Sequence, residues 1–224
     1  MIFTTRILDQ SQLAIARSLI GGAAVSDGRR SAFGAAGKVQ NNLQVALDER
    51  GSAQLATLMV EALSRSQPFF RQALPSEISA PMINCHAPGM HYGPHYDAPV
   101  FMSPAGQRIR ADLSATLFVT PPDQYEGGEL TILRDGQAQE IKLAAGQLVV
   151  YPASLLHEVR PVRSGTRHAI VFWVQSMIQD KESRELFYRL DDVVERISRR
   201  IPEGDEVRDL VGVFSGLGRL WLKP

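Results

Sequence analysis

The chain has 224 residues, and its 24 basic side chains balance its 24 acidic ones. This length suits one domain with a small appendage, and the 44% hydrophobic content excludes a disordered chain. The neutral charge balance gives no general attraction to nucleic acid or to a membrane surface, and the single cysteine, Cys85, excludes a disulfide framework and a cysteine-rich metal site.

The first 75 residues predict a mixed, mainly helical flank. Arg6 and Asp9 stand where a signal peptide needs an apolar run, and no stretch of about 18 apolar residues follows, so we expect a cytoplasmic protein without a transmembrane helix. Asp9 or Ser11 is suited to cap a first helix. Apolar residues at helical spacing predict a second helix over residues 52–66.

Residues 80–178 predict a β-rich core. Short apolar, β-branched segments alternate there with glycine-containing turns, at 113–120, 129–133, 139–143, 147–151 and 167–175. Asp135-Gly136 between two of these segments indicates a hairpin. Strands of this length and spacing are typical of a β-sandwich or a barrel. The stretch 98–110 is expected to be a loop.

Residues 179–224 predict a helical appendage to a domain that spans residues 1–178. Asp180 can cap a helix, and Pro202 and Gly204 can end it. The inward stripe of this helix is predicted to contain Leu186, Leu190, Val193, Val194 and Ile197. A shorter amphipathic segment follows, with Val207, Leu210, Val211 and Phe214. Its apolar face either packs on the β-core, which is the commoner case, or meets a second subunit in a homodimer.

Two of the five histidines belong to a pattern that suits a metal. In a strand, residues two apart point to the same face, so His95 and Asp97 would present an imidazole and a carboxylate side by side. His157, which follows the segment 147–151, is the best third ligand. Two imidazoles and one carboxylate leave positions open on an iron(II) ion, as oxygen chemistry requires. His91 and His168 are expected not to be ligands.

Arg167 begins the last long predicted strand, shortly after His157. A dicarboxylate that chelates the metal through its keto-acid end has a second carboxylate several ångströms away. A buried guanidinium can bind that carboxylate through two parallel hydrogen bonds. Without the metal ligands, Arg167 would be interpreted as an exposed strand end.

The order His95-Tyr96-Asp97, His157, Arg167 resembles the iron(II)- and 2-oxoglutarate-dependent dioxygenases, and within them the bacterial PKHD-type hydroxylases related to prolyl 4-hydroxylases. The similar segments are 39–42, 111–118, 125–130, 148–154 and 172–176. The resemblance implies a double-stranded β-helix, or jelly roll, with flanking helices. It also implies iron(II) on His95, Asp97 and His157, 2-oxoglutarate on Arg167, dioxygen as second co-substrate and L-ascorbate as a supporting cofactor.

The chain departs from the family pattern beside this site. The family often has Tyr-x-x-Gly-x-x-Tyr before the His-x-Asp, and here His86 replaces the first tyrosine while Gly89 and Tyr92 fit. We therefore predict His86 and Tyr92 as co-substrate-binding residues. Ala169 cannot supply the hydroxyl group that some relatives place there.

The predicted function is hydroxylation, with decarboxylation of 2-oxoglutarate to succinate. A protein or peptide side chain and a free small molecule both fit as substrate. A second hypothesis, motivated by His86 and Ala169, is a non-catalytic sensor or partner-binding protein that holds iron or 2-oxoglutarate without turnover. A third is a zinc hydrolase, which would leave Arg167 without a task.

Overall fold

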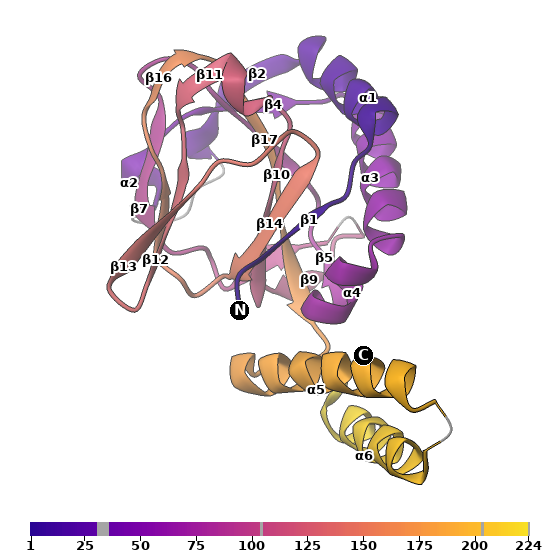
Figure 1. Ribbon diagram of the computed structural model, residues 1–224. Helices are drawn as coiled ribbons and strands as arrows, with labels where there is room; N and C mark the ends of the chain where they lie inside the picture. Colours follow the sequence, from indigo (N-terminus) through magenta and orange to yellow (C-terminus); the bar gives the residue numbers. More distant parts are fainter. Residues whose placement is uncertain (31–35, 104, 203, 224) are drawn as a thin grey trace.

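Two antiparallel sheets form the centre of the computed structural model, which describes residues 1–30, 36–103, 105–202 and 204–223 (Figure 1). The larger sheet has the strand order β1-β14-β10-β17-β6-β4-β2, with β5 paired to β17, and the smaller one has the order β13-β12-β15-β7-β3. Antiparallel sheets in this arrangement, with flanking helices, confirm the predicted jelly-roll core.

The larger sheet contains β1 (Phe3–Arg6), β2 (Ala24–Asp27), β4 (Leu43–Ala46), β5 (Pro75–Ile78), β6 (Met82–His86), β10 (Leu113–Phe118), β14 (Gln147–Pro152) and β17 (Arg167–Ser176). The smaller sheet contains β3 (Gln40–Asn41), β7 (His91–His95), β12 (Leu130–Arg134), β13 (Gln137–Ile141) and β15 (His157–Val159). Two separate pairs are β8 (Val100–Met102) with β9 (Arg108–Arg110), and β11 (Tyr125–Gly127) with β16 (Val162–Gly165).

Helices cover one face of the larger sheet. They are α1 (Gln10–Gly21), α3 (Glu49–Ser64) and α4 (Gln67–Ala73), and Figure 1 shows them along one side of the sheet. Their buried side chains, such as Leu13 and Leu55, form one cluster with Leu117, Leu148 and Phe172 of the sheet. Because this cluster fills the outer side of β10, β14 and β17, the opposite faces of these strands are left to line the interior between the two sheets.

The predicted N-terminal helices are confirmed. Asp9 caps α1, where its carboxylate accepts from the backbone N–H of Gln12, and Asp48 caps α3. The short helix α4 was not predicted; Ser66 caps it and a proline follows in its first turn. In its described residues, the connection between α1 and α3 holds β2, η1 (Gly28–Arg30), α2 (Ala36–Val39), β3 and β4.

The hairpin predicted at Asp135-Gly136 joins β12 and β13. Both residues have positive φ, 52° and 77°, as a two-residue turn of this kind requires. We expect Gly136→Ala to lower the free energy of unfolding by about 1–2 kcal/mol, because an L-residue pays a steric cost in this conformation. Gly212→Ala is the matched control. Gly212 lies inside a helix with open space around its Cα, so alanine there should raise the free energy of unfolding by about 1 kcal/mol.

Chemical denaturation of the two alanine variants beside the unchanged protein tests this pair. An unchanged or raised free energy of unfolding in Gly136→Ala would contradict the assignment of the turn conformation.

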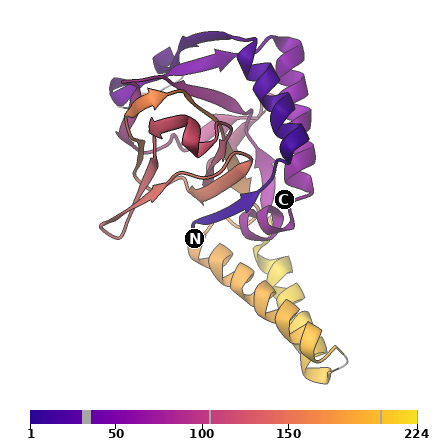
Figure 2. The ribbon, with the colours of Figure 1, turned by 45° about the horizontal axis from the view of Figure 1, so that its top comes forward.

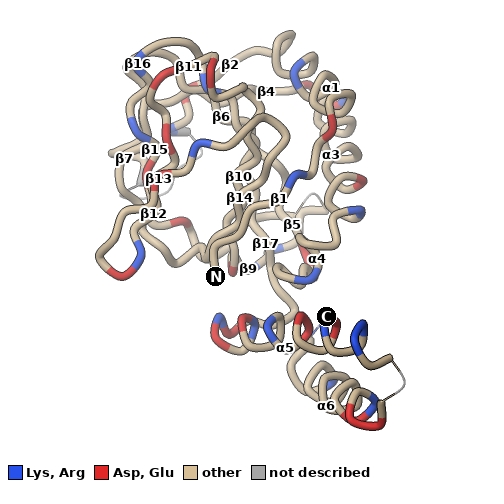
Figure 3. Tube along the Cα trace, viewed as in Figure 1, with Lys and Arg blue, Asp and Glu red and all other residues tan. Residues whose placement is uncertain are grey.

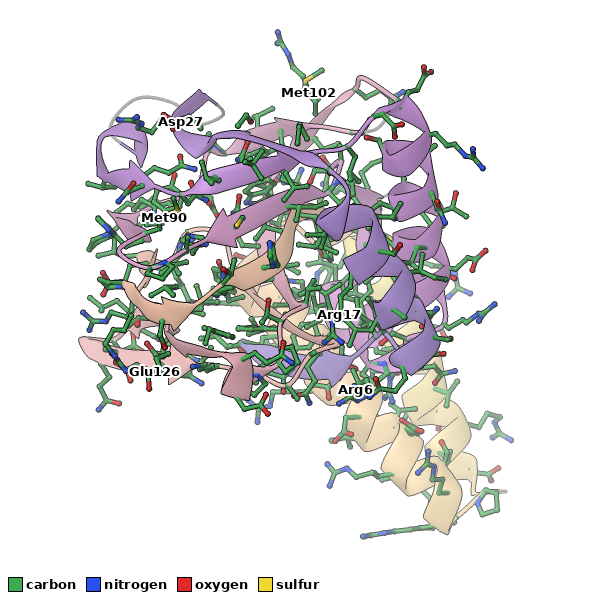
Figure 4. The ribbon with its side chains drawn as sticks, turned by 90° about the horizontal axis from the view of Figure 1, so that it is seen from above. Arg6, Arg17, Asp27, Met90, Met102 and Glu126 are labelled. Carbon is green, nitrogen blue, oxygen red and sulfur yellow. The ribbon has the colours of Figure 1, made fainter. Side chains whose placement is uncertain are left out.

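The stretch 98–110 is not the plain loop that was predicted. It contains the two-stranded hairpin β8–β9, with Val100 opposite Arg110 and Phe101 opposite Ile109. Val100 and Met102 are exposed, and Met102 extends away from the body of the protein (Figure 4). Phe101 points the other way and stacks on Trp173 of β17. One face of the hairpin is thereby fixed to the larger sheet.

The C-terminal residues form a pair of helices, α5 (Lys181–Arg200) and α6 (Asp205–Trp221), that projects from the body (Figure 2). Asp180 caps α5 as predicted. Both helices contain basic and acidic residues (Figure 3). No helix in the described part of the chain is long and apolar enough to cross a membrane.

The predicted inward stripe of α5 is wrong in one position. Leu186 is 55% exposed, while its neighbour Phe187 is buried against Phe214 of α6. Phe187 takes the place of Leu186 in the buried stripe, because α5 packs on α6 and on α4. Val211, predicted to face inward on α6, is also exposed. A contact between this face and a second subunit stays a prediction.

Candidate metal centre

Neighbouring strands of the smaller sheet bring His95, Asp97 and His157 together. His95 ends β7, His157 begins β15, and the two residues are opposite each other in the strand register. Asp97 lies just beyond the end of β7, so its carboxylate reaches the same point from the connecting segment. One ligand atom from each residue lies within 4.8 Å of the others. The Asp97 carboxylate is 3.9 Å from Nε2 of His95 and 3.7 Å from Nε2 of His157.

Backbone carbonyl groups orient both imidazoles. Nδ1 of His95 donates to the carbonyl of Gly93 at 2.8 Å, and Nδ1 of His157 donates to that of Leu155 at 3.0 Å. Each Nε2 therefore keeps its lone pair and faces Asp97, which is how metal-binding imidazoles are usually held. Burial, followed by the nearby His157, lowers the pKa of His95 to about 4. Two neutral imidazoles and a carboxylate fit a divalent cation.

Ser114 supports the carboxylate from the larger sheet. Its hydroxyl group donates to Oδ2 of Asp97, and the strand β10 that carries it is buried along its whole length. Sequence reasoning did not assign this residue. Ser114 and Thr116 alternate with Leu113, Ala115 and Leu117, and polar residues at every second position of a buried strand were a usable signal of a polar interior face.

Removal of the Ser114 hydroxyl group should weaken the metal site without removing a ligand. Loss of a residue that hydrogen-bonds to a metal ligand typically lowers the affinity for the metal roughly 10–100-fold. We therefore expect Ser114→Ala to weaken Mn(II) binding by about that factor, as measured by titration calorimetry. Ser164→Ala is the control, since Ser164 is exposed on β16. Equal affinities in the two variants would show that Ser114 does not position Asp97.

Arg167 lies in the same cavity as the three ligands. The cavity has a volume of about 620 Å³ and is lined from both sheets. The Arg167 side chain is only 2% exposed, it forms no ion pair within the described part of the chain, and its Nε and Nη2 have no hydrogen-bond partner there. Burial lowers its pKa. A buried guanidinium without an anion is costly, so this end of the cavity is suited to a carboxylate from a ligand.

Tyr92 lines the cavity, whereas His86 is not among the described residues that line it. His86 is opposite Arg167 in the register of β6 and β17 and is fully buried, and neither of its ring nitrogens has a partner among the described residues. Burial, and then Arg167, hold its pKa well below the usual range, so it is neutral. Tyr92 instead stacks on His95, with ring centroids 3.6 Å apart. Burial, with a smaller effect of Asp97, raises the pKa of Tyr92 to about 12.

The cavity wall beside the metal ligands is aromatic. Phe101 of the β8–β9 hairpin and Trp173 of β17 stack with their centroids 3.5 Å apart, and both line the cavity. Trp173 is buried but also lines the cavity, and its indole nitrogen has no partner in the described part of the protein. Cys85 is buried and forms no disulfide.

Comparison with known proteins agrees with this geometry. Residues 81–175 match the family model of the 2OG-Fe(II) oxygenase superfamily. The chain is 41% identical over 218 residues to a PKHD-type hydroxylase of Paracoccus denitrificans, with 96% of each chain covered. It is 35% identical over 223 residues to a PKHD-type hydroxylase of Burkholderia ambifaria, with 99% of this chain and 98% of the relative covered.

Two solved structures share the fold at low sequence identity. A 2OG-Fe(II) oxygenase family oxidoreductase from Burkholderia pseudomallei is 18% identical with a TM-score of 0.57, over 78% of this chain and 84% of the other. A prolyl-4-hydroxylase from Pseudomonas putida is 19% identical with a TM-score of 0.52, over 78% of this chain and 92% of the other.

Proposed function

This chain belongs to the PKHD-type hydroxylases of the 2OG-Fe(II) oxygenase superfamily, and from that membership we propose which of its residues carry the activity. As a member it is a 2-oxoglutarate-dependent dioxygenase. We assign iron(II) to His95, Asp97 and His157, and the far carboxylate of 2-oxoglutarate to Arg167. The observation that carries this assignment is the convergence of the three ligands in one cavity with a buried guanidinium that has no anion.

Iron(II) and 2-oxoglutarate, when bound, supply the oxidative decarboxylation to succinate and the hydroxylation of a C–H bond. The work of the protein is to hold and orient these groups. His95 and His157 present fixed Nε2 atoms, Ser114 holds Asp97, and Arg167 fixes the far end of the co-substrate. The stacked rings of Phe101 and Trp173 form an aromatic part of the cavity wall.

The substrate itself is unidentified, but the cavity limits its chemistry. Among the described residues that line the cavity, Asp97 is the only acidic side chain and Arg167 the only lysine or arginine. The two histidines are the metal ligands. With these committed to the metal and the co-substrate, no charged side chain remains for the substrate. The group presented to the iron is therefore uncharged. A neutral part of a protein side chain and a neutral small molecule both satisfy this condition.

Turnover measurements with matched histidine variants test the proposal. The protein, purified without oxygen, should carry iron(II) and should convert 2-oxoglutarate to succinate in air, with L-ascorbate as the reductant that we propose supports it. His95→Ala should lose both properties, whereas His91→Ala, on the same strand but outside the ligand cluster, should keep them. Stable binding of iron and 2-oxoglutarate without any succinate, even with candidate substrates added, would favour the non-catalytic sensor instead.

A further inference from the structure

Helix α6 has one packed face and one face that is open to solvent. On the packed face, Phe214 and Trp221 contact Phe187 of α5. On the open face, Val213 is 57% exposed, and Leu220, at 71%, is the most exposed large apolar side chain in the described part of the chain. Because α6 belongs to the appendage that projects from the body (Figure 2), this open face is accessible to a partner.

The open face follows one regular stripe along the helix. Residues three or four positions apart lie on the same side of an α-helix. The stripe opposite the packed face has this spacing throughout and consists of Asp205, Asp209, Gly212, Gly216 and Arg219. A Cβ atom added to either glycine would meet nothing within 4 Å, so a second helix can approach the backbone there. Val213 and Leu220 border the glycines, which gives the stripe an apolar centre between charged ends.

The charges of α6 are divided between its two ends. Residues 205–209 contain three acidic side chains and one arginine, whereas the only charged side chains in residues 210–223 are Arg219 and Lys223, both basic. This order also suits the dipole of the helix itself, but the dipole does not account for the exposed apolar side chains between the ends. Exposed apolar groups with a polar rim are typical of a protein–protein contact.

A second copy of the same helix complements this face. Two copies related by a two-fold axis present the same patch to each other. If the two helices run antiparallel, the acidic end of each lies against the basic end of the other. With the axis at the level of residue 214, Asp209 of one copy is opposite Arg219 of the second copy, and Gly212 is opposite Gly216, because both pairs are symmetric about that level. One register therefore matches the charges and the glycines together.

We propose that the open face of α6 is a homodimer interface, in which the α6 helices of two copies pack antiparallel with Asp209 paired to Arg219 of the second copy at both ends. None of the described residues of α6 lines the metal-centre cavity, so this contact does not depend on the proposed function. A helix of 17 residues is about 25 Å long, which makes the interface small, and small interfaces are typical of weak association. Exposed ion pairs are screened by salt, so the dimer should weaken as ionic strength rises.

Sedimentation of the full chain tests the proposal through a charge exchange. Over about 1–200 µM, the parent should change from the mass of one chain to that of two. Asp209→Arg places arginine opposite arginine at both ends, and Arg219→Asp places aspartate opposite aspartate, so we expect each variant to raise the Kd of the dimer about tenfold. An equimolar mixture of the two variants should dimerise like the parent, because both ends then pair an arginine with an aspartate. Arg189→Asp, an exposed charge reversal on α5, is the matched control.

The apolar centre has a separate test. We expect Leu220→Gln to raise the Kd of the dimer about tenfold, whereas Val60→Gln, at a 66% exposed position on α3, should leave it unchanged. Leu220 is exposed in the single chain, so its replacement should alter neither unfolding at concentrations where the chain is monomeric nor the turnover of 2-oxoglutarate. These two measurements identify a folding defect or a failure of the proposed function independently of dimerisation.

Three results would overturn the proposal. A parent that stays monomeric over the whole concentration range would leave the open face of α6 to a different protein. A dimer with the same Kd in the parent, Asp209→Arg and Arg219→Asp would use another face. Failure of the mixed variants to dimerise, when each alone has lost the dimer, would exclude the antiparallel pairing of Asp209 with Arg219.

Discussion

The His157→Ala protein is expected to lose its iron and to form no succinate above background. His157 supplies one of three ligands, and it is held by its strand register opposite His95 and by the carbonyl of Leu155. Loss of a ligand should cost more than the roughly 10–100-fold loss in affinity expected when an outer partner is removed. Metal analysis after purification without oxygen, followed by succinate assays with added iron(II), measures both effects.

The interpretation needs a control for folding, because His157 is buried. Thermal unfolding of the metal-free forms gives it. If the substitution acts through the metal, the metal-free variant should unfold close to the metal-free parent, while added Mn(II) should raise the unfolding temperature of the parent alone. Iron content equal to that of the parent would mean that His157 is not a ligand.

The metal ligands and Arg167 could be chosen from the sequence because their spacing carries chemical information. His95 and Asp97 are two residues apart, His157 follows one predicted strand, and Arg167 begins the next. Ser114 stood in a segment that resembles the family, yet no role was assigned to it. It acts across the fold, on Asp97. A contact between segments that are distant in sequence follows from strand order and register, and a single sequence does not contain these.

The same reasoning explains where the fold departs from expectation. The main strands were predicted well, because apolar, β-branched runs of this length leave few alternatives. The β8–β9 hairpin was missed because its outward residues, such as Val100 and Met102, are apolar and hide the alternation that marks a half-exposed strand. On α5, both Leu186 and Phe187 are apolar and either could have been the buried residue. Phe187 is buried because it packs on Phe214 of α6, and the position of α6 could not be predicted from the sequence.

Arg167→Met is expected to produce a protein that is more stable than its parent in the absence of ligands and nearly unable to bind 2-oxoglutarate. The guanidinium is buried and forms no ion pair among the described residues; the ring of Phe118 lies 5.3 Å away, and Glu129 has only a smaller, favourable effect on its pKa. Methionine fills a similar volume without a charge. Replacement of buried charged groups by apolar residues of similar size can raise stability by roughly 1–4 kcal/mol, and we expect a gain toward the lower end of that range.

Ligand binding should reverse this order of stabilities. A ligand that binds only the folded state raises its stability in proportion to the logarithm of its concentration over the Kd. In the presence of Mn(II), a saturating concentration of 2-oxoglutarate should therefore raise the unfolding temperature of the parent. The unfolding temperature of Arg167→Met should be almost the same with Mn(II) alone as with Mn(II) and 2-oxoglutarate. Arg167→Lys separates charge from geometry, since it keeps the positive charge but loses the two parallel donors. If Arg167→Met instead lowers the stability of the ligand-free protein, the guanidinium must stabilise the fold through partners within the protein. It would then not be a buried charge that waits for the carboxylate of a ligand.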